Sequence, residues 1–186
     1  MTWLLIFLAI VAIGGVTIYN SLVKLRTHAH GAWADIDVQL KRRYDLIPNL
    51  VETVKGYASH EKDTLEAVIN ARNRAMSATG PAEKAQAENM LTGALKSLFA
   101  LSEAYPQLRA VESFTSLQGT LEEIEGAVQS SRRYYNAVVR DYNTKVEQFP
   151  SVLVANAFRF EKEEFFELDD EVQRETPKVS FGEGEA

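Results

Sequence analysis

Cysteine is absent from this chain of 186 residues, so the sequence offers no disulfide, no thiolate ligand and no cysteine nucleophile. Histidine is scarce, with only His28, His30 and His60. On one helix, His28 and His30 would point about 200° apart, too far to bind one metal ion together. No glutamate precedes a histidine by three residues, as the di-iron sites of helical bundles require. The sequence therefore predicts no metal centre and no cofactor.

Motifs typical of enzymes and of nucleic-acid-binding proteins are also lacking. No Gly-x-Ser-x-Gly or Ser-x-x-Lys motif occurs where a strand would turn into a helix, so serine chemistry is not indicated. Arginine and tyrosine do mix between Arg132 and Tyr142, as in some single-strand binders. Tyr135 and Tyr142 share an apolar helical stripe, which favours core tyrosines beside exposed arginines. We predict a protein that is not an enzyme and binds neither nucleic acid nor a small-molecule substrate.

Most of the chain lacks an excess of either charge. The net charge is −6, yet from Glu161 onward ten acidic residues face three basic ones, so this segment alone carries −7 and the rest +1. A near-neutral body lacks the basic surface that binding to a phosphate backbone requires. Acidity is thus confined to the C-terminal segment.

The first 23 residues contain no charged side chain, and an apolar run extends from Trp3 to Tyr19. As a helix this run would be about 26 Å long, and it reaches the thickness of a bilayer core once its flanks are included. A cleaved signal peptide is disfavoured, because no basic residue precedes the run and no clear cleavage pattern follows it. We therefore expect residues 1–22 to form a retained transmembrane anchor in contact with the lipid bilayer.

Basic residues follow this run directly, at Lys24 and Arg26, and again at residues 41–43. Lys and Arg close to a span are retained on the cytoplasmic side of the membrane. We therefore expect a single-pass protein with its N-terminus outside and the following domain in the cytoplasm.

Apolar residues recur at steps of three, four or seven after the anchor, which predicts helices. We expect these over residues 22–58, from a cap at Ser59 to residues 78–80, over residues 81–104 and over residues 112–148. Pro48 should kink or break the first of them near residues 44–47, because proline has no backbone donor. Met76 and Met90 are assigned to the core stripes of the second and third.

No segment alternates apolar and polar residues as a half-buried strand does, and the linkers are short. The predicted fold class is therefore all-α. It consists of the N-terminal transmembrane helix, an elongated up-and-down antiparallel bundle of about four helices over residues 23–149, and a C-terminal arm.

Residues 150–186 differ from the bundle because phenylalanines stand among acidic residues. Acidic blocks favour solvated chain, whereas clustered apolar side chains favour docking. We expect an extended arm whose first part packs on the bundle. Its candidate interaction residues are Phe158, Phe160, Phe165 and Phe166.

Arg42 and Arg43 stand just before Pro48 and admit two interpretations. They can donate hydrogen bonds to the carbonyl groups that the proline leaves free and so tie neighbouring helices together. Alternatively, one of them faces an acidic partner protein at the expected kink. Both residues are therefore candidate interaction residues as well.

Several segments together resemble the signature of the bacterial LemA family. They are YNSLV at residues 19–23, WADIDVQLKRRYDLIPNLV at 33–51, YASHE at 57–61, RRYYN at 132–136, YN at 142–143, FP at 149–150 and PKVSF at 177–181. The resemblance covers nearly the whole chain. It implies a single-pass protein of the bacterial cell (inner) membrane with a bundle of about four helices and no known enzymatic activity. Members are loosely associated with membrane organisation, envelope stress and membrane proteases.

The hypothesis from the sequence is a non-enzymatic, membrane-anchored helical scaffold that forms homo-oligomers. The alternative is an adaptor or regulator of a membrane protease or transporter, in which the phenylalanine-bearing arm is the docking element. The residues alone do not identify the partner.

Overall fold

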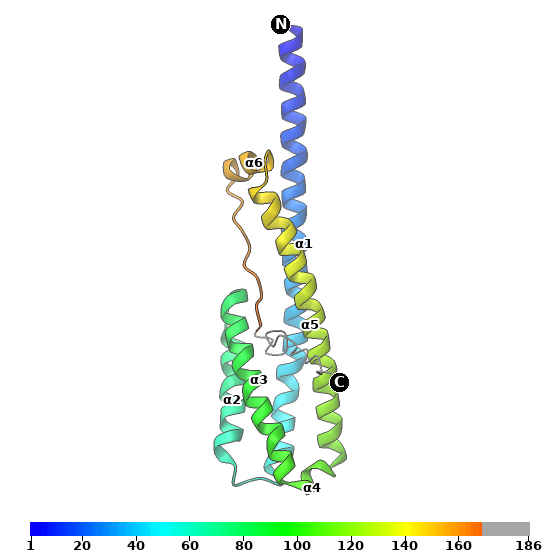
Figure 1. The fold of residues 1–186 in the computed structure, drawn as a ribbon, viewed down its shortest axis with the longest axis vertical. Helices are drawn as coiled ribbons and strands as arrows, with labels where there is room; N and C mark the ends of the chain where they lie inside the picture. The colour runs from blue at the N-terminus through cyan, green and yellow to red at the C-terminus, as the bar shows by residue number, and fades with distance from the viewer. Residues whose placement is uncertain (169–186) are drawn as a thin grey trace, which may run out of the picture.

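The computed structural model describes residues 1–168, which form six helices and no strand. This confirms the all-α fold class. The helices are α1 (Thr2–Lys55), α2 (Lys62–Ser77), α3 (Gly80–Ala104), α4 (Pro106–Arg109), α5 (Glu112–Glu147) and α6 (Ser151–Ala157). In Figure 1, α5 lies antiparallel along α1, and the α2–α3 hairpin packs beside the part of α1 farthest from the N-terminus.

Helix α1 contains both the predicted anchor and the first helix of the bundle without interruption. At 1.5 Å per residue its 54 residues extend about 80 Å. Among residues 1–168, it is the one helix long and apolar enough to cross a membrane. Its first part extends beyond the bundle (Figure 1), and the side chains from Trp3 to Val16 are largely exposed. Within residues 1–168, this apolar surface therefore has no partner.

The expected break near residues 44–47 does not occur, because α1 continues through Pro48 to Lys55. Proline removes the amide that would bond to the carbonyl of Tyr44, four residues earlier. Arg72 of α2 replaces it, since its Nε donates to the Tyr44 carbonyl oxygen at 2.7 Å. The proline itself lies on the exposed side, while Ile47 and Leu50 remain buried. A side chain from a neighbouring helix thus compensates for the missing hydrogen bond.

The core follows the predicted apolar stripes and joins all the long helices. Its centre lies between α1 and α5, where Ile36, Leu40, Ile124, Val128 and Val139 are buried. The buried apolar residues of the α2–α3 hairpin are leucines and a valine together with several alanines, namely Leu65, Val68, Ala71, Ala75, Ala85, Ala87, Leu91, Leu95 and Leu98. Ala75 and Leu91 take the buried positions, and the adjacent Met76 and Met90 are exposed, so the assignment of these methionines to the core was wrong.

The first residues of α2 and α3 differ from the predicted ones. Ser59 does not cap α2, which begins at Lys62 with Glu61 as its cap residue. Glu61 is held by the residue that follows α3, since the Tyr105 hydroxyl donates to its Oε1 at 3.0 Å. Helix α3 begins one residue earlier than expected, at Gly80, whose positive φ of 73° suits glycine.

The bond from Arg72 generates the first testable prediction. We expect Arg72→Met to lower the free energy of unfolding by about 1–2 kcal/mol, because the Tyr44 carbonyl loses its charged donor. In a Pro48→Ala background the restored amide can bond to this carbonyl, so the same substitution should cost less. Chemical denaturation of the full chain in detergent measures both effects. The exposed Arg74→Met serves as the matched control, and equal costs of Arg72→Met in both backgrounds would contradict the interpretation.

Candidate functional site

A cluster of charged and polar side chains lies buried between α1, α3 and α5. Arg43 is at its centre, with Nη1 donating to Glu88 Oε2 at 2.7 Å and Nη2 to Thr92 Oγ1 at 3.0 Å. The same Nη2 lies 3.0 Å from Glu125 Oε2 on α5. The Tyr44 hydroxyl donates to Glu88 Oε1. One guanidinium therefore links three helices.

Burial dominates the electrostatics of this cluster. Desolvation raises the pKa of Glu88, and the neighbouring Arg43 opposes that effect by favouring the carboxylate. The pKa of Tyr44 is also raised, first by burial and then by the Glu88 carboxylate that accepts its proton in a hydrogen bond. Both shifts follow from enclosure among packed helices. They suit a cluster that fixes helix positions, because each polar group already has a partner within the chain.

A second feature is the extended arm of residues 158–168, which follows α6 and runs back along α5 (Figure 1). Asn143 bonds twice to Glu163, donating from Nδ2 to its carbonyl at 2.9 Å and accepting from its amide at 2.9 Å. Asn136 binds Phe166 in the same manner, at 3.0 and 2.9 Å. Each of these side-chain amides thus donates one hydrogen bond to the arm's backbone and accepts one from it, as a neighbouring strand would.

Two tyrosines and one arginine reinforce this pairing. The Tyr142 hydroxyl donates to the carbonyl of Glu161, and that of Tyr135 to the carbonyl of Glu164, both at 2.8 Å. Arg132 donates to the carbonyl of Leu168 at 3.1 Å. Burial, with Glu163 and Glu164 nearby, raises the pKa of Tyr135 to about 12, and burial also raises that of Tyr142. Both hydroxyls therefore remain protonated donors at neutral pH.

The binding residues on α5 and the arm residues that they bind are spaced at nearly the same distance. Each Tyr-Asn pair on α5 lies seven residues from the other, about 10.5 Å along a helix. The arm residues that they bind lie three apart, which is about 10 Å along an extended chain. Because the two distances agree, both pairs can bind the arm without distorting it.

The structure places the predicted interaction residues in different environments. Arg43, Phe160 and Phe166 are buried within the chain, so in this conformation they present no surface to a partner. Arg42 is exposed beside Gln39, to which it donates at 3.1 Å. Phe158 and Phe165 remain partly or largely exposed. The interpretation that Arg43 ties neighbouring helices together fits its geometry. Its partners, however, are two carboxylates and the Thr92 hydroxyl, and not the carbonyl freed by Pro48.

Aromatic contacts secure the arm at both ends. Phe166 packs edge-on against Trp33 of α1, with ring centres 5.4 Å apart, and Trp33 also contacts Tyr135. Near the anchor, Tyr19 contacts Phe158 at 4.8 Å and Phe160 at 5.6 Å. The phenylalanines expected to mediate docking therefore act in part within the molecule, by holding the arm against α1.

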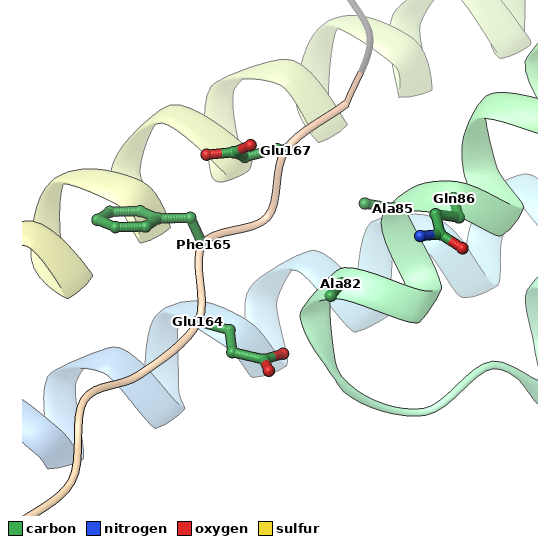
Figure 2. A pocket seen from close by; sticks show the side chains of 6 residues that line it. All are labelled: Ala82, Ala85, Gln86, Glu164, Phe165 and Glu167. Atoms are coloured by element: carbon green, nitrogen blue, oxygen red, sulfur yellow. The ribbon is translucent and has the colours of Figure 1, made fainter.

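An open pocket of about 400 Å³ lies between the arm and α3. Figure 2 shows Ala82, Ala85 and Gln86 on α3 facing the arm, which contributes Glu164, Phe165 and Glu167. Phe165 points away from α3 in this view, whereas Glu164 extends between the arm and α3. Within residues 1–168, no group of three or more histidines or carboxylates is arranged to hold a metal ion. The pocket offers small apolar side chains and carboxylates, which suit contact with a polypeptide better than a chemical reaction.

Sequence reasoning missed Glu88, Asn136 and Asn143. No local pattern in the sequence marks Glu88 as the buried partner of Arg43. The asparagines carried a signal, since Tyr135-Asn136 and Tyr142-Asn143 repeat the same dipeptide at a spacing of seven. Such a repeat places polar side chains on one helix face beside the core.

Comparison with known proteins agrees with this architecture. The family model described as "LemA family" matches residues 32–181. This chain belongs to the LemA family. The match confirms the resemblance drawn from the sequence, and it covers the cluster around Arg43 and the α5–arm pairing.

Relatives of this LemA family member include magnetosome proteins. "Magnetosome protein MamQ 2" of Paramagnetospirillum magneticum is 23% identical over 175 residues, covering 80% of this chain and 64% of that protein. "Protein LemA" of Metamycoplasma hominis is 24% identical over 140 residues, covering 73% of this chain and 63% of that protein. The chain thus spans slightly less than two thirds of these relatives.

The buried cluster generates the second prediction. Arg43→Met leaves the Glu88 carboxylate buried without its cation, so we expect unfolding to become easier by about 3–5 kcal/mol. The double variant Arg43→Met with Glu88→Met should cost much less than the sum of the single substitutions, because no buried charge is left unpaired at that contact. Denaturant titration of the full chain measures this coupling.

A matched control for this cycle lies on the surface of α1. Lys55 and Glu52 form an exposed pair at 3.7 Å, and replacing Lys55 by methionine should change stability by less than about 1 kcal/mol. Additive costs at Arg43 and Glu88 would show that the two side chains do not act as a pair.

Proposed function

We propose that this LemA family member is a non-enzymatic, membrane-anchored scaffold that presents its helical bundle to other proteins and to copies of itself. The observation that carries the proposal is the continuity of α1, which joins the apolar anchor to the bundle in one helix. A continuous helix transmits position and orientation, whereas a flexible linker does not. The bundle is therefore held upright at a fixed distance from the membrane.

The surface of the bundle supplies candidate contacts for self-association. On α1, Val38 is exposed and lies one turn before the exposed Arg42, so the two share a solvent-facing side of the helix. An apolar residue beside an arginine is a combination found at protein interfaces. We assign contact between copies to this face, because parallel anchoring in one membrane would bring equivalent faces to the same height.

A second candidate function is that of an adaptor for a membrane protease, a transporter or another membrane protein. The observation that favours it is Phe165, which is 37% exposed and whose ring points away from α3. An arm pinned at Asn136 and Asn143 would present this ring in a defined position.

The proposal includes the location and orientation of the chain. The cell membrane is supported by the anchor and by the LemA family membership. A cytoplasmic bundle with the N-terminus outside is supported by Lys24 and Arg26, which follow the apolar run and resist translocation.

The third prediction concerns assembly. Arg42→Glu should weaken self-association by roughly tenfold, equivalent to about 1.4 kcal/mol, because this face also carries the exposed Asp45 and would become acidic on both copies. Native mass spectrometry and sedimentation in mild detergent measure it. Arg140→Glu, at an exposed arginine on α5, is the matched control. Monomer alone at high concentration for the unaltered chain would refute the scaffold's self-association.

One further variant, measured in the same way, separates the two functions. Phe165→Ser removes an exposed ring and leaves the buried Phe166 in place, so the bundle should keep its stability. An adaptor would lose a cross-linked membrane partner while its own assembly is unchanged. A scaffold that acts through α1 would keep both.

The fourth prediction concerns topology. Because the chain has no cysteine, Ser113→Cys places a single thiol on the exposed start of α5, at the end of the bundle far from the anchor. We expect a membrane-impermeant thiol reagent to label it only after the cells are permeabilised. Labelling in intact cells would overturn the orientation and direct the search for partners to the cell envelope.

A further inference from the structure

The end of the bundle nearest the anchor carries a cluster of exposed apolar side chains. Residues 148–158, which include α6, form the longest stretch without a charged residue outside the anchor. Within it Phe149 is 75% exposed, and Leu153 and Phe158 are each 62% exposed. Single exposed apolar residues are ordinary, but three large ones in one short uncharged segment need a partner.

This cluster lies at the height where the anchor ends. Phe158 packs against Tyr19, and α6 is held to α1 by Ala155 and Val154, which contact the group that includes Ile18 and Leu22. Tyr19 ends the apolar run that begins at Trp3, and the two aromatic residues stand about 24 Å apart along the helix. Tyrosine and tryptophan at the two ends of a span mark the membrane interfaces.

The orientation of α6 and the charges next to it fit a membrane surface. Figure 1 shows α6 lying across the direction of α1, as a helix lying in the plane of a membrane would. Lys24 and Arg26 follow the anchor, and Arg159 follows the uncharged segment. Basic residues at this level can meet lipid phosphates, and exposed apolar side chains such as Phe149 and Leu153 are suited to the boundary between headgroups and acyl chains.

We infer that α6, with the flanking Phe149 and Phe158, is a second membrane contact that inserts into the leaflet from which the anchor emerges. The inference rests on the proposed membrane anchoring and adds a site to it. The occupant is lipid and not a soluble protein, because the cluster adjoins the anchor at the level of Tyr19. Two contacts side by side would prevent the bundle from rotating freely about the axis of α1.

The fifth prediction tests this contact in the full chain, reconstituted into vesicles of phosphatidylcholine and phosphatidylglycerol. A single cysteine carrying an NBD fluorophore replaces Leu153, or Phe149 in a second variant. Leu153 is exposed, so the label should leave the fold intact, which circular dichroism checks. We expect strong quenching by lipids with a nitroxide near the headgroup, weaker quenching by lipids with a deep nitroxide, and protection from iodide in the water.

Two further labelled positions make the outcomes distinguishable. Ile10→Cys reports the anchor and should be quenched best by the deep nitroxide, whereas Ser113→Cys at the far end of the bundle should be quenched by iodide alone. Quenching by lipid at residue 10 but not at 149 or 153 would overturn the membrane contact and leave the anchoring intact. No quenching by lipid at residue 10 would instead overturn the anchoring.

A second copy of the chain is the competing occupant. In that case residue 153 would be protected from iodide, would not be quenched by the nitroxide lipids, and would lose its protection as the ratio of protein to lipid is lowered. This result would overturn the lipid contact in favour of a contact between copies.

Discussion

The continuity of α1 through Pro48 is the constraint on which the rest of the molecule depends. If the helix bent sharply there, the buried Leu50 and Val54 would no longer continue in the direction of the segment whose Arg43 and Tyr44 bind Glu88 on α3. Arg72 bonds to the backbone carbonyl of Tyr44, while the side chain of Tyr44 bonds to Glu88. One residue of α1 is therefore fixed by α2 through its backbone and by α3 through its side chain. The hairpin and the long helix stabilise each other at this point. Because α1 is continuous, the bundle segment of the helix continues in the direction of the anchor.

The helices of this fold could be predicted from sequence because the apolar stripes record directly which face is buried. The continuity at Pro48 could not, because its compensating donor lies 28 residues away on another helix. Met76 and Met90 were misplaced because each stands beside another apolar residue, Ala75 or Leu91, and periodicity alone does not say which of two neighbours is buried. Glu88 gave no signal, because burial of a charge is decided by its partner and not by its neighbours in sequence.

In the arm, the sequence pattern indicated which side chains pack on the bundle but not their register along α5. Its phenylalanines are prominent in the sequence, and the prediction that its first part packs on the bundle fits the contacts of Phe160 and Phe166. Its register, however, depends on hydrogen bonds from Asn136 and Asn143 to backbone groups, which apolar patterning does not record. The repeated Tyr-Asn dipeptide encodes that register, since seven helical residues and three extended ones cover nearly the same length. The sequence therefore predicted which residues of the arm contact the bundle, but not the hydrogen bonds that hold the arm's backbone.

Membrane contact at α6 and the pinned arm would be mechanically linked, because α6 leads directly into residues 158–168. The arm carries Glu161, Glu163, Glu164 and Glu167 along α5, away from the anchor and toward the α2–α3 hairpin. Near an anionic membrane, carboxylates are repelled and basic residues attracted within about one Debye length, roughly 10 Å. The order of residues along the chain satisfies both tendencies, with apolar side chains and Arg159 at the membrane end and acids beyond them. The same field that holds α6 at the surface would therefore favour the extended path that Asn136 and Asn143 fix.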